Sequence, residues 1–300
     1  MEIIKNELSW LILGGDGQMG NALRAELGLR NQSFWSLGSK ALDISDKEMV
    51  LGALQELKPH VVINAAAWTN VDGAEENETL VRETNAFGPQ NVAKGCAGIG
   101  ARFVHFSTDY VFSGDSKVPW SEIQPTSPIS VYGKSKAEGE QLALSEYPSG
   151  TYVMRTSWLY SQWGSNFVKT MVRLAYGDKN FIEVVGDQVG QPTSAAHLAS
   201  QVYNLVNSLA RPGIYHGSNT GQTTWYEFAK VIFEFIGADS SRIKEIRSEE
   251  LNRLAARPRY SVLGQENWIR EGLAPMSNWR DAFVEVFPAI EARVKLEDAL

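Results

Sequence analysis

Short apolar runs and longer stretches with helical spacing alternate along the first half of the chain. The apolar runs read as buried strands because their hydrophobic residues are contiguous. They lie at residues 9–13, 33–37, 60–64, 102–107 and 151–155. The segments between them that place apolar residues at helical spacing are 21–29, 47–57, 78–98 and 132–146. This alternation predicts an α/β fold, in which a doubly wound parallel sheet has helices on both faces.

The pattern loosens after about residue 158, where Gly, Pro, Ser and Trp become more frequent and the apolar runs shorten. We expect a smaller α/β lobe there. Val184-Val185 and Ile214 to His216 are candidate strands that return to the main sheet. The predicted large domain is therefore 1–158 with returning segments at about 184–217. The predicted small lobe is about 159–183 and 218–300.

Charge and cysteine content narrow the function classes. The 300 residues hold 28 Lys and Arg against 35 Asp and Glu, a net charge of −7, which argues against a general nucleic-acid binder. Cys96 is the single cysteine, so a disulfide within the chain is excluded, and the four histidines lack metal-ligand spacing. No metal is predicted. Met1 to Leu8 lacks a long apolar core, and no stretch approaches the roughly 18 apolar residues of a membrane span. We expect a cytoplasmic protein without a membrane partner.

A glycine-rich turn joins the first strand to the first helix. Gly14, Gly17 and Gly20 are spaced Gly-x-x-Gly-x-x-Gly, with Gln18 and Met19 inside the motif. Glycine lets the backbone approach a pyrophosphate closely, and amides at a helix N-terminus favour the phosphate charge. The position after a strand and before a helix is the context that a dinucleotide site requires. A Rossmann-type NAD(P)-binding domain is the prediction.

Residues near the ends of the second and third strands are candidates for the rest of the cofactor. Ser39 and Lys40 stand where a ribose 2′-phosphate would lie, and no acidic residue directly follows that strand, which favours NADPH over NADH. Asp43 and Ile44 are candidates for the adenine, although Asp43 or Ser45 also fits a helix N-cap. The small residues after the third strand let a dinucleotide lie close to the sheet edge: Asn64, Ala65, Ala66 and Ala67.

Three residues form a candidate catalytic group. Tyr132 and Lys136 are four apart on a predicted helix and therefore share a face. A neighbouring ammonium is expected to lower the pKa of the tyrosine, so that Tyr132 donates a proton near neutral pH. Thr108 ends the fourth strand, where ligands bind in parallel sheets, and its hydroxyl is suited to hold a substrate carbonyl.

Several longer motifs resemble the dTDP-4-dehydrorhamnose reductases, a family of extended short-chain dehydrogenases. The resemblance runs from about Leu11 to Phe287. Its motifs are Asn64 to Ala67, Val71 to Glu75, Ser107 to Phe112, Arg155 to Tyr160, Asn166 to Val168, Asp187 to Thr193, and Arg257-Pro258 with Ser261 and Leu263.

The resemblance implies reduction of the 4-keto group of dTDP-4-dehydro-L-rhamnose by NADPH or NADH, within dTDP-rhamnose and cell-wall polysaccharide biosynthesis. It implies that Thr108, Tyr132 and Lys136 are catalytic. The residues that match positions lining the sugar pocket are Thr69, Val71, Thr108, Asp109, Tyr110 and Trp158. Arg257 is a candidate for the nucleotide phosphates, or else for a structural ion pair. Trp225 is expected to pack within the small lobe.

Two departures from the family pattern are visible. Trp68 stands where the family often has tyrosine. Some members dimerise around magnesium through a glutamate just past the glycine loop, but this chain has Asn21-Ala22 there, with Asp16 nearby. We therefore expect a monomer or weak homodimer.

Two alternative functions remain at this stage. One is a reductase or epimerase acting on another nucleotide-linked keto sugar. A 4,6-dehydratase is disfavoured, since Asp109 is followed by Tyr110 rather than by glutamate. The other is a non-catalytic regulatory subunit of the methionine adenosyltransferase type, against which the intact Thr108, Tyr132 and Lys136 argue.

Overall fold

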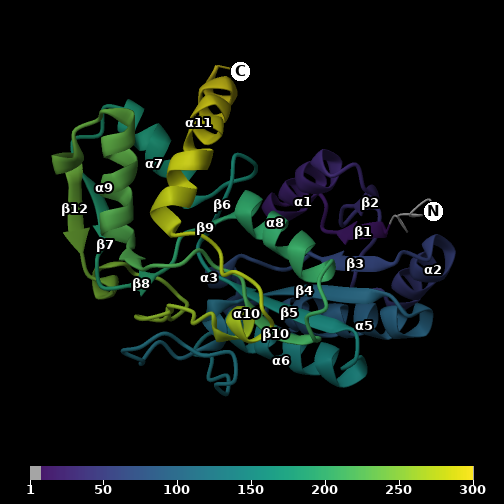
Figure 1. The fold of residues 1–300 in the computed structure, drawn as a ribbon. Coiled ribbons are helices and arrows are strands. Elements are labelled where there is room, and N and C mark those ends of the chain that lie inside the picture. The colour runs from purple at the N-terminus through teal and green to yellow at the C-terminus, as the bar shows by residue number, and fades with distance from the viewer. Residues whose placement is uncertain (1–7, 300) are drawn as a thin grey trace.

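The computed structural model describes residues 8–299. Residues 1–7 and 300, at the outer ends of the two predicted domains, lie outside this range. Most of Met1 to Leu8, the segment without the apolar core of a signal peptide, lies outside it as well. A six-stranded sheet forms the centre of the molecule (Figure 1), with the strand order β10-β5-β4-β3-β1-β2 and every pair parallel. Its strands are β1 (Ser9–Leu13), β2 (Ser33–Leu37), β3 (Val61–Asn64), β4 (Arg102–Thr108), β5 (Thr151–Thr156) and β10 (Gly213–His216). The order reverses direction beside β1 and β3, and ligands of such sheets bind at the carboxyl edge near this point.

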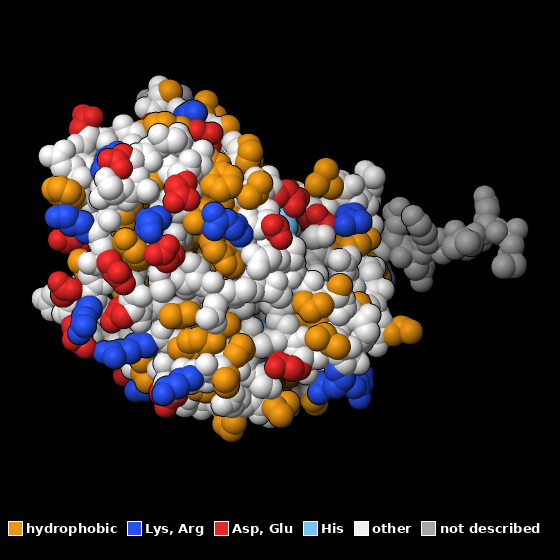
Figure 2. Space-filling view, turned by 60° about the vertical axis from the view of Figure 1, so that its left-hand side comes forward, with side chains coloured by type: hydrophobic (Ala, Val, Ile, Leu, Met, Phe, Trp, Pro, Cys, Tyr) orange, Lys and Arg blue, Asp and Glu red, His pale blue; other side chains and the backbone are white. Residues whose placement is uncertain are grey.

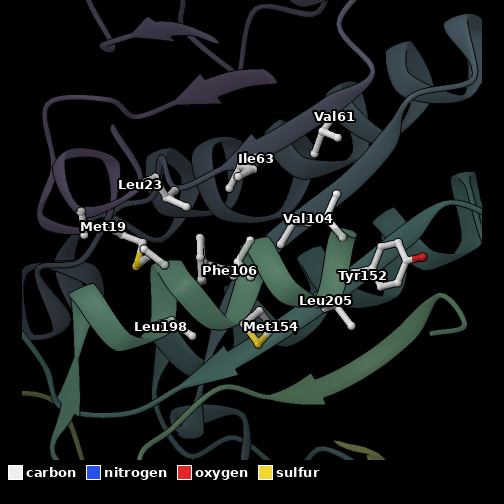
Figure 3. Packing of buried hydrophobic residues seen from close by; sticks show 14 of the residues in the cluster. Met19, Leu23, Val61, Ile63, Val104, Phe106, Tyr152, Met154, Leu198 and Leu205 are labelled. Atoms are coloured by element: carbon white, nitrogen blue, oxygen red, sulfur yellow. The ribbon is translucent and has the colours of Figure 1, made fainter. Parts of the chain in front are cut away.

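Helices cover both faces of the sheet. One face carries α1 (Gln18–Leu29) and α8 (Ala195–Val206), which pack against each other. Figure 3 shows side chains of these two helices meeting those of β3, β4 and β5, including Leu23, Ile63, Phe106 and Leu198. The other face carries α2 (Lys47–Leu57), α5 (Gly88–Ile99) and α6 (Val131–Glu146). The fold class is therefore the predicted doubly wound α/β sheet.

A smaller lobe lies beside the carboxyl edge of the sheet, at the left of Figure 1. Its helices are α7 (Phe167–Tyr176), α9 (Trp225–Ile236) and α11 (Trp279–Asp298), which share a separate hydrophobic core. Its parallel strand pair is β7 (Ile182–Val185) and β12 (Ile243–Ile246). Two shorter pairs connect the lobes: β6 (Leu159–Tyr160) with β9 (Thr193–Ser194), and β8 (Val189–Gly190) with β11 (Thr223–Thr224).

Two segments belong to a different lobe from the one predicted from the sequence. The expectation that Val184-Val185 returns to the main sheet is wrong, because β7 pairs with β12. The strand beside β5 is β10, so the predicted return of Ile214 to His216 to the main sheet is confirmed. In the segment assigned to the small lobe, α10 (Glu266–Arg270) instead packs on β10, and its Trp268 belongs to the core of the large lobe.

The segment predicted as one long helix at 78–98 is interrupted. It consists of α4 (Glu78–Arg82), a π-helical turn η1 (Glu83–Phe87) and α5. Such turns are often found at functional sites. The remaining short helices are α3 (Val71–Glu76), η2 (Asp109–Val111), η3 (Ser240–Arg242) and η4 (Ser248–Glu250).

The surface of the described chain carries acidic and basic side chains side by side. Figure 2 shows Lys and Arg interspersed with Asp and Glu over the face in view, with no large patch of one sign. No helix within residues 8–299 is long and apolar enough to cross a membrane.

Candidate active site

The glycine loop packs closely against itself and against the loop after β3 at the N-terminus of α1. Gly14 has φ +77°, and a Cβ there would lie 2.5 Å from the backbone nitrogen of Ala66. At Gly20 a Cβ would lie 2.3 Å from the Gly14 carbonyl oxygen. Gly17 is the N-cap of α1, and as a glycine it has no side chain to accept from the first amides of the helix. Bare amides at the start of a 12-residue helix and a backbone without side chains fit a dinucleotide pyrophosphate.

The structure places the other predicted cofactor residues at different depths. Ser39 and Lys40 are exposed just beyond β2, where they are accessible to a ligand. Asp43 Oδ1 accepts hydrogen bonds from the nitrogen and hydroxyl of Ser45, at 2.9 and 2.7 Å, while Ile44 is buried in the core against α5. The N-cap of α2 is Asp46 rather than Asp43 or Ser45, since its carboxylate accepts from the Met49 nitrogen.

The candidate site is a cleft of about 360 Å³ at the carboxyl edge of the sheet. We call it the main cleft. It is lined by Gln18, Met19, Ala65, Ala67, Thr69, Val71, Phe106, Ser107, Thr108, Asp109, Tyr110, Tyr132, Lys136, Thr156, Ser157, Trp158, Leu159 and Trp225. The structure thus brings together the three predicted catalytic residues, all predicted sugar-pocket residues and part of the cofactor set.

The base of this cleft, which we call the floor, consists of Thr108, Asp109, Tyr132 and Lys136. Thr108 is the last residue of β4, and its hydroxyl donates to Asp109 Oδ1 at 3.0 Å. The other carboxylate oxygen of Asp109 is buried and has no hydrogen-bond partner in the described chain. Burial raises the pKa of Asp109 to about 6, although the hydrogen bond from Thr108 opposes the shift. Asp109 therefore has an unused acceptor at a cleft that would hold a polar ligand.

Tyr132 lies in the first turn of α6, which begins where Ser130 caps the Gly133 nitrogen. The sequence predicted a lowered pKa for this tyrosine, and that prediction is wrong for the structure. Burial raises the pKa of Tyr132 to about 12, and a hydrogen bond with Thr108 opposes the shift. Desolvation of the phenolate outweighs the hydrogen bond with Thr108, so Tyr132 keeps its proton and is suited to donate it.

Lys136 lies one turn further along α6, and only 2% of it is exposed. Its Nζ donates to the carbonyl oxygen of Phe106 at 2.6 Å and lies 3.4 Å from His105 Nε2. Burial lowers the pKa of Lys136 to about 8, and the charge of Glu140 opposes the shift. A lysine poised near neutral pH is suited to exchange a proton.

Asn85 is a residue that the sequence analysis did not single out. It lies in the π-helical turn and is buried. Its side chain accepts from the Trp68 nitrogen at 2.8 Å and donates to the Trp68 carbonyl and to Ser135 Oγ, both at 3.1 Å. It therefore ties the loop after β3 to the helix that carries Tyr132. The break of the helix has a local signal that the prediction of one long helix missed, because Gly88-Pro89 directly follow the turn and Pro89 cannot donate an intrahelical hydrogen bond.

The opposite side of the cleft presents Trp158 and Trp225. Together with Arg253 and Arg257, which line the adjoining pocket, they form what we call the wall. Trp158 has φ +45°, a strained backbone for a bulky residue. Its indole stacks on Trp225 with ring centroids 3.6 Å apart and planes 10° apart. Trp225 therefore belongs to the site rather than only to the packing of the small lobe. The two residues are 67 positions apart, so local sequence gave no sign of the stack.

A second pocket of about 400 Å³, the side pocket, shares Tyr110 and Trp225 with the main cleft. Arg253 and Arg257 line it. Arg257 forms two hydrogen bonds to the carboxylate of Asp72, at 3.1 and 2.7 Å, and holds the pKa of Asp72 below its usual range. The structure thus gives Arg257 the structural ion pair and also places it at a ligand pocket.

The loop positions considered for a metal are occupied by local contacts. Asn21 donates from its amide to the carbonyl oxygens of Asp16 and Gly17, at 3.0 and 2.9 Å. Asp16 is exposed, and its carboxylate lies against Gly38 at the end of β2. No group of three or more His, Cys, Asp or Glu side chains within 8–299 is arranged to hold a metal ion. Trp68 does not line the cleft, and its indole nitrogen donates to the Asn70 carbonyl.

Comparison with known proteins gives consistent matches over nearly the whole chain. Residues 9–291 match the family model described as the RmlD substrate binding domain. A dTDP-4-dehydrorhamnose reductase of Streptomyces griseus is 43% identical over 95% of this chain and 94% of its own length. A dTDP-4-keto-6-deoxy-D-glucose reductase of Streptomyces niveus is 38% identical over 94% of this chain and 98% of its own. The crystal structure of a dTDP-4-dehydrorhamnose reductase from Bacillus anthracis in complex with NADP has a TM-score of 0.90 and 38% identity, covering 94% and 99% of the two chains.

Proposed function

Since this chain belongs to the RmlD substrate binding domain family, we propose that it reduces the 4-keto group of dTDP-4-dehydro-L-rhamnose to give dTDP-L-rhamnose, with NADPH as reductant. The observation that carries the proposal is the convergence of Thr108, Tyr132 and Lys136 on one cleft beside the glycine loop. This arrangement joins a proton donor to a dinucleotide site, which is what the reduction of a ketone requires.

Reduction forms a C–H bond at sugar C4 and an O–H bond on the oxygen attached to it. NADPH supplies the hydride when it is bound at the loop. Tyr132 gives its hydroxyl proton to the sugar oxygen, and the hydroxyl of Thr108 orients that oxygen in the same cleft. Lys136 stabilises the phenolate that remains, because its ammonium lies one helical turn away.

The side pocket is the proposed site of the dTDP group. It opens from the main cleft past Tyr110 and Trp225, so a substrate can place its sugar over the floor and its nucleotide in the side pocket. Arg253 and Arg257 offer positive charge for a diphosphate. Aromatic residues of the same pocket, Phe167 and Trp225, offer flat surfaces for a base.

NADPH is the proposed reductant for two reasons. Ser39 and Lys40 are exposed beyond β2, where they can meet a 2′-phosphate. The Bacillus anthracis relative, which is 38% identical, is described in complex with NADP. Asp16 beside Gly38 is an acidic group near the same end of the strand, so NADH is included in every assay as the competing reductant.

The test follows the absorbance of the reduced nicotinamide with purified protein and two sugars, dTDP-4-dehydro-L-rhamnose and dTDP-4-keto-6-deoxy-D-glucose. We expect consumption of NADPH with the first, and dTDP-L-rhamnose as the product by NMR. Faster turnover of the second sugar would move the proposal to the activity named for the Streptomyces niveus relative. No turnover of either sugar, by protein that binds NADPH, would contradict the proposal.

Two further expectations from the sequence remain predictions. We propose that the chain is a monomer or weak homodimer, which sedimentation equilibrium at several concentrations would measure. We also propose a cytoplasmic location, which cell fractionation would test.

A further inference from the structure

A chain of polar contacts leads from the loop after β3 to Lys136. The Ala66 nitrogen donates to Asn64 Oδ1 at 3.0 Å. Asn64 Nδ2 lies 3.2 Å from His105 Nδ1, and His105 Nε2 lies 3.4 Å from Lys136 Nζ. Asn64 and His105 are fully buried. The protein therefore determines the direction of each hydrogen bond without help from solvent.

The direction follows from which groups can only donate. The Ala66 N–H has no acceptor capacity, so the amide oxygen of Asn64 must face it. The NH₂ group of Asn64 then faces His105, and this group also can only donate. His105 Nδ1 is therefore an acceptor, and a neutral imidazole carries its one proton on Nε2. His105 stays neutral because burial and the charge of Lys136 hold its pKa well below the usual value.

The Nε2–H of His105 thus faces the terminal nitrogen of Lys136. An ammonium has only donors, so it is repelled by this N–H, whereas a neutral amine has a lone pair that accepts from it. We propose that His105 is a positioning residue whose fixed tautomer favours release of a proton from Lys136. The inference rests on the proposed reductase function, in which Lys136 compensates the phenolate of Tyr132.

Other groups around Lys136 favour its charged ammonium form. The Phe106 carbonyl at 2.6 Å accepts a hydrogen bond from it, and an ammonium donates more strongly than an amine. Glu140, one turn further along α6, favours the ammonium by its charge. That carboxylate is already paired with Arg155 of β5 at 2.6 Å, which weakens its influence. The remaining titratable groups at the floor are Tyr132 and Asp109.

These opposed contacts allow Lys136 to pass a proton to Tyr132. When Tyr132 has given its proton to the sugar oxygen, a proton that leaves Nζ for the phenolate restores the tyrosine. Lys136 is then a neutral amine, and the Nε2–H of His105 becomes its donor. The Phe106 carbonyl accepts from either form, and within the described residues Nζ has no hydrogen-bond or ion-pair partner besides Phe106 and His105. His105 is therefore the group that distinguishes the two states.

His216 is a natural comparator in the same molecule. It is also fully buried, and burial lowers its pKa to about 3. Its Nδ1 lies 2.8 Å from the carbonyl oxygen of Gly264, which can only accept, so the proton of His216 must be on Nδ1. The two buried histidines are therefore expected to be neutral and to hold opposite tautomers.

The first experiment reads the tautomers in the native protein without cofactor or substrate. Long-range proton–nitrogen NMR spectra of ¹⁵N-histidine-labelled protein distinguish Nδ1–H from Nε2–H. Among the four histidines, two should not titrate, one in each tautomer, and the His216→Asn variant should lose the Nδ1–H signals. The proposal would be overturned if both non-titrating rings carried their proton on Nδ1. It would also be overturned if the His105 ring did so in the His216→Asn variant. This result does not depend on any enzymatic activity.

The second experiment measures kcat/KM against pH for two variants. In His105→Gln the amide reaches Nζ and can turn its oxygen to the ammonium, so the alkaline limb should move up by about one pH unit. In His105→Asn the shorter amide reaches Asn64 but not Lys136, and a smaller upward shift is expected.

A purely structural role of His105 would lower kcat without moving the limb. An unmoved limb in either folded variant therefore contradicts the proposal, and the tautomer measurement decides if neither variant folds. If native protein turns over no keto sugar at all, the proposed function fails while the tautomer result still stands.

Discussion

The floor of the main cleft and the adjoining wall hold charged groups in opposite ways. On the floor, Lys136 and Asp109 are at most 2% exposed and form no ion pair within the described chain. Burial accordingly lowers the pKa of Lys136 to about 8 and raises that of Asp109 to about 6. On the wall, Arg257 binds Asp72 through two hydrogen bonds, and the pKa of Asp72 is lowered.

The difference indicates separate tasks. Groups whose charged form is disfavoured exchange protons readily, so the floor is suited to chemistry. Groups that are already paired keep their charge and geometry, so the wall is suited to recognition. The floor should therefore govern kcat and the pH dependence of stability, whereas the wall should govern KM.

The largest effect is expected on the floor, from Tyr132→Phe. The ring keeps its packing against Tyr110 but loses the proton donor. We expect kcat to fall about a thousandfold with little change in KM, as measured by NADPH consumption at saturating sugar.

Tyr160→Phe is the matched control. The Tyr160 hydroxyl is buried, has no partner in the described structure and lies outside the main cleft. Its loss should leave kcat near the native value. Equal loss of activity in both variants would show that packing, rather than proton donation, is being measured.

Beneath the floor, Arg155→Met should cause the largest loss of stability. Arg155 and Glu140 form a buried ion pair at 2.6 Å, so removal of one partner leaves an uncompensated charge. We expect the free energy of unfolding to fall by about 3–5 kcal/mol in urea titrations.

The double variant Arg155→Met/Glu140→Leu removes both charges and should recover most of this stability. If the double variant is as unstable as the single one, lost packing rather than unpaired charge explains the effect.

Asp109→Asn tests the floor through the pH dependence of protein stability. The pKa of Asp109 is about 6 in the folded protein, above the ordinary value of 3.8. Between these values the folded state binds the additional proton, so native stability should fall as pH rises from about 4 to 6 and then stay level. The variant cannot ionise, so it should lack this fall and be about 3 kcal/mol more stable at neutral pH.

Urea unfolding from about pH 4 to 7 measures this difference, and activity should decrease in the same variant. Parallel stability curves for the two proteins would contradict the raised pKa.

The smallest effect is expected on the wall, from Trp225→Ala. Loss of the indole removes an aromatic surface of the proposed nucleotide pocket, worth about 0.5–1.5 kcal/mol of binding free energy, which corresponds to a KM for the sugar nucleotide about two- to tenfold higher. We expect kcat and the KM for NADPH to remain close to native. Trp225→Phe retains an aromatic surface, so its KM for the sugar nucleotide should lie between those of the native protein and Trp225→Ala. A fall in kcat with unchanged KM would show that Trp225 acts in the chemical step, like the floor residues, and not in recognition.

Much of the large lobe was predictable from local pattern. The glycine loop, the strand ends and the Tyr-x-x-x-Lys spacing each lie within one short segment, and each segment ends at the same edge of a parallel sheet. The small lobe was less predictable because β7 and β12 are short and have no local sign of their partner. The side-chain hydrogen bonds of Asn85 and the stack of Trp158 on Trp225 depend on contacts between distant segments.

The sequence by itself determined the α/β class, the family and the residue types at the carboxyl edge, because hydrophobic periodicity and short motifs are local properties. Only the tertiary structure decided the protonation of these groups. Tyr132 and Lys136 share a helix face in any folded form. The pKa of Tyr132, however, depends on burial, Thr108 and Asp109, and the pKa of Lys136 depends on burial and Glu140. Desolvation and hydrogen-bond direction arise from groups that meet only when the chain has folded, and spacing along the sequence does not encode them.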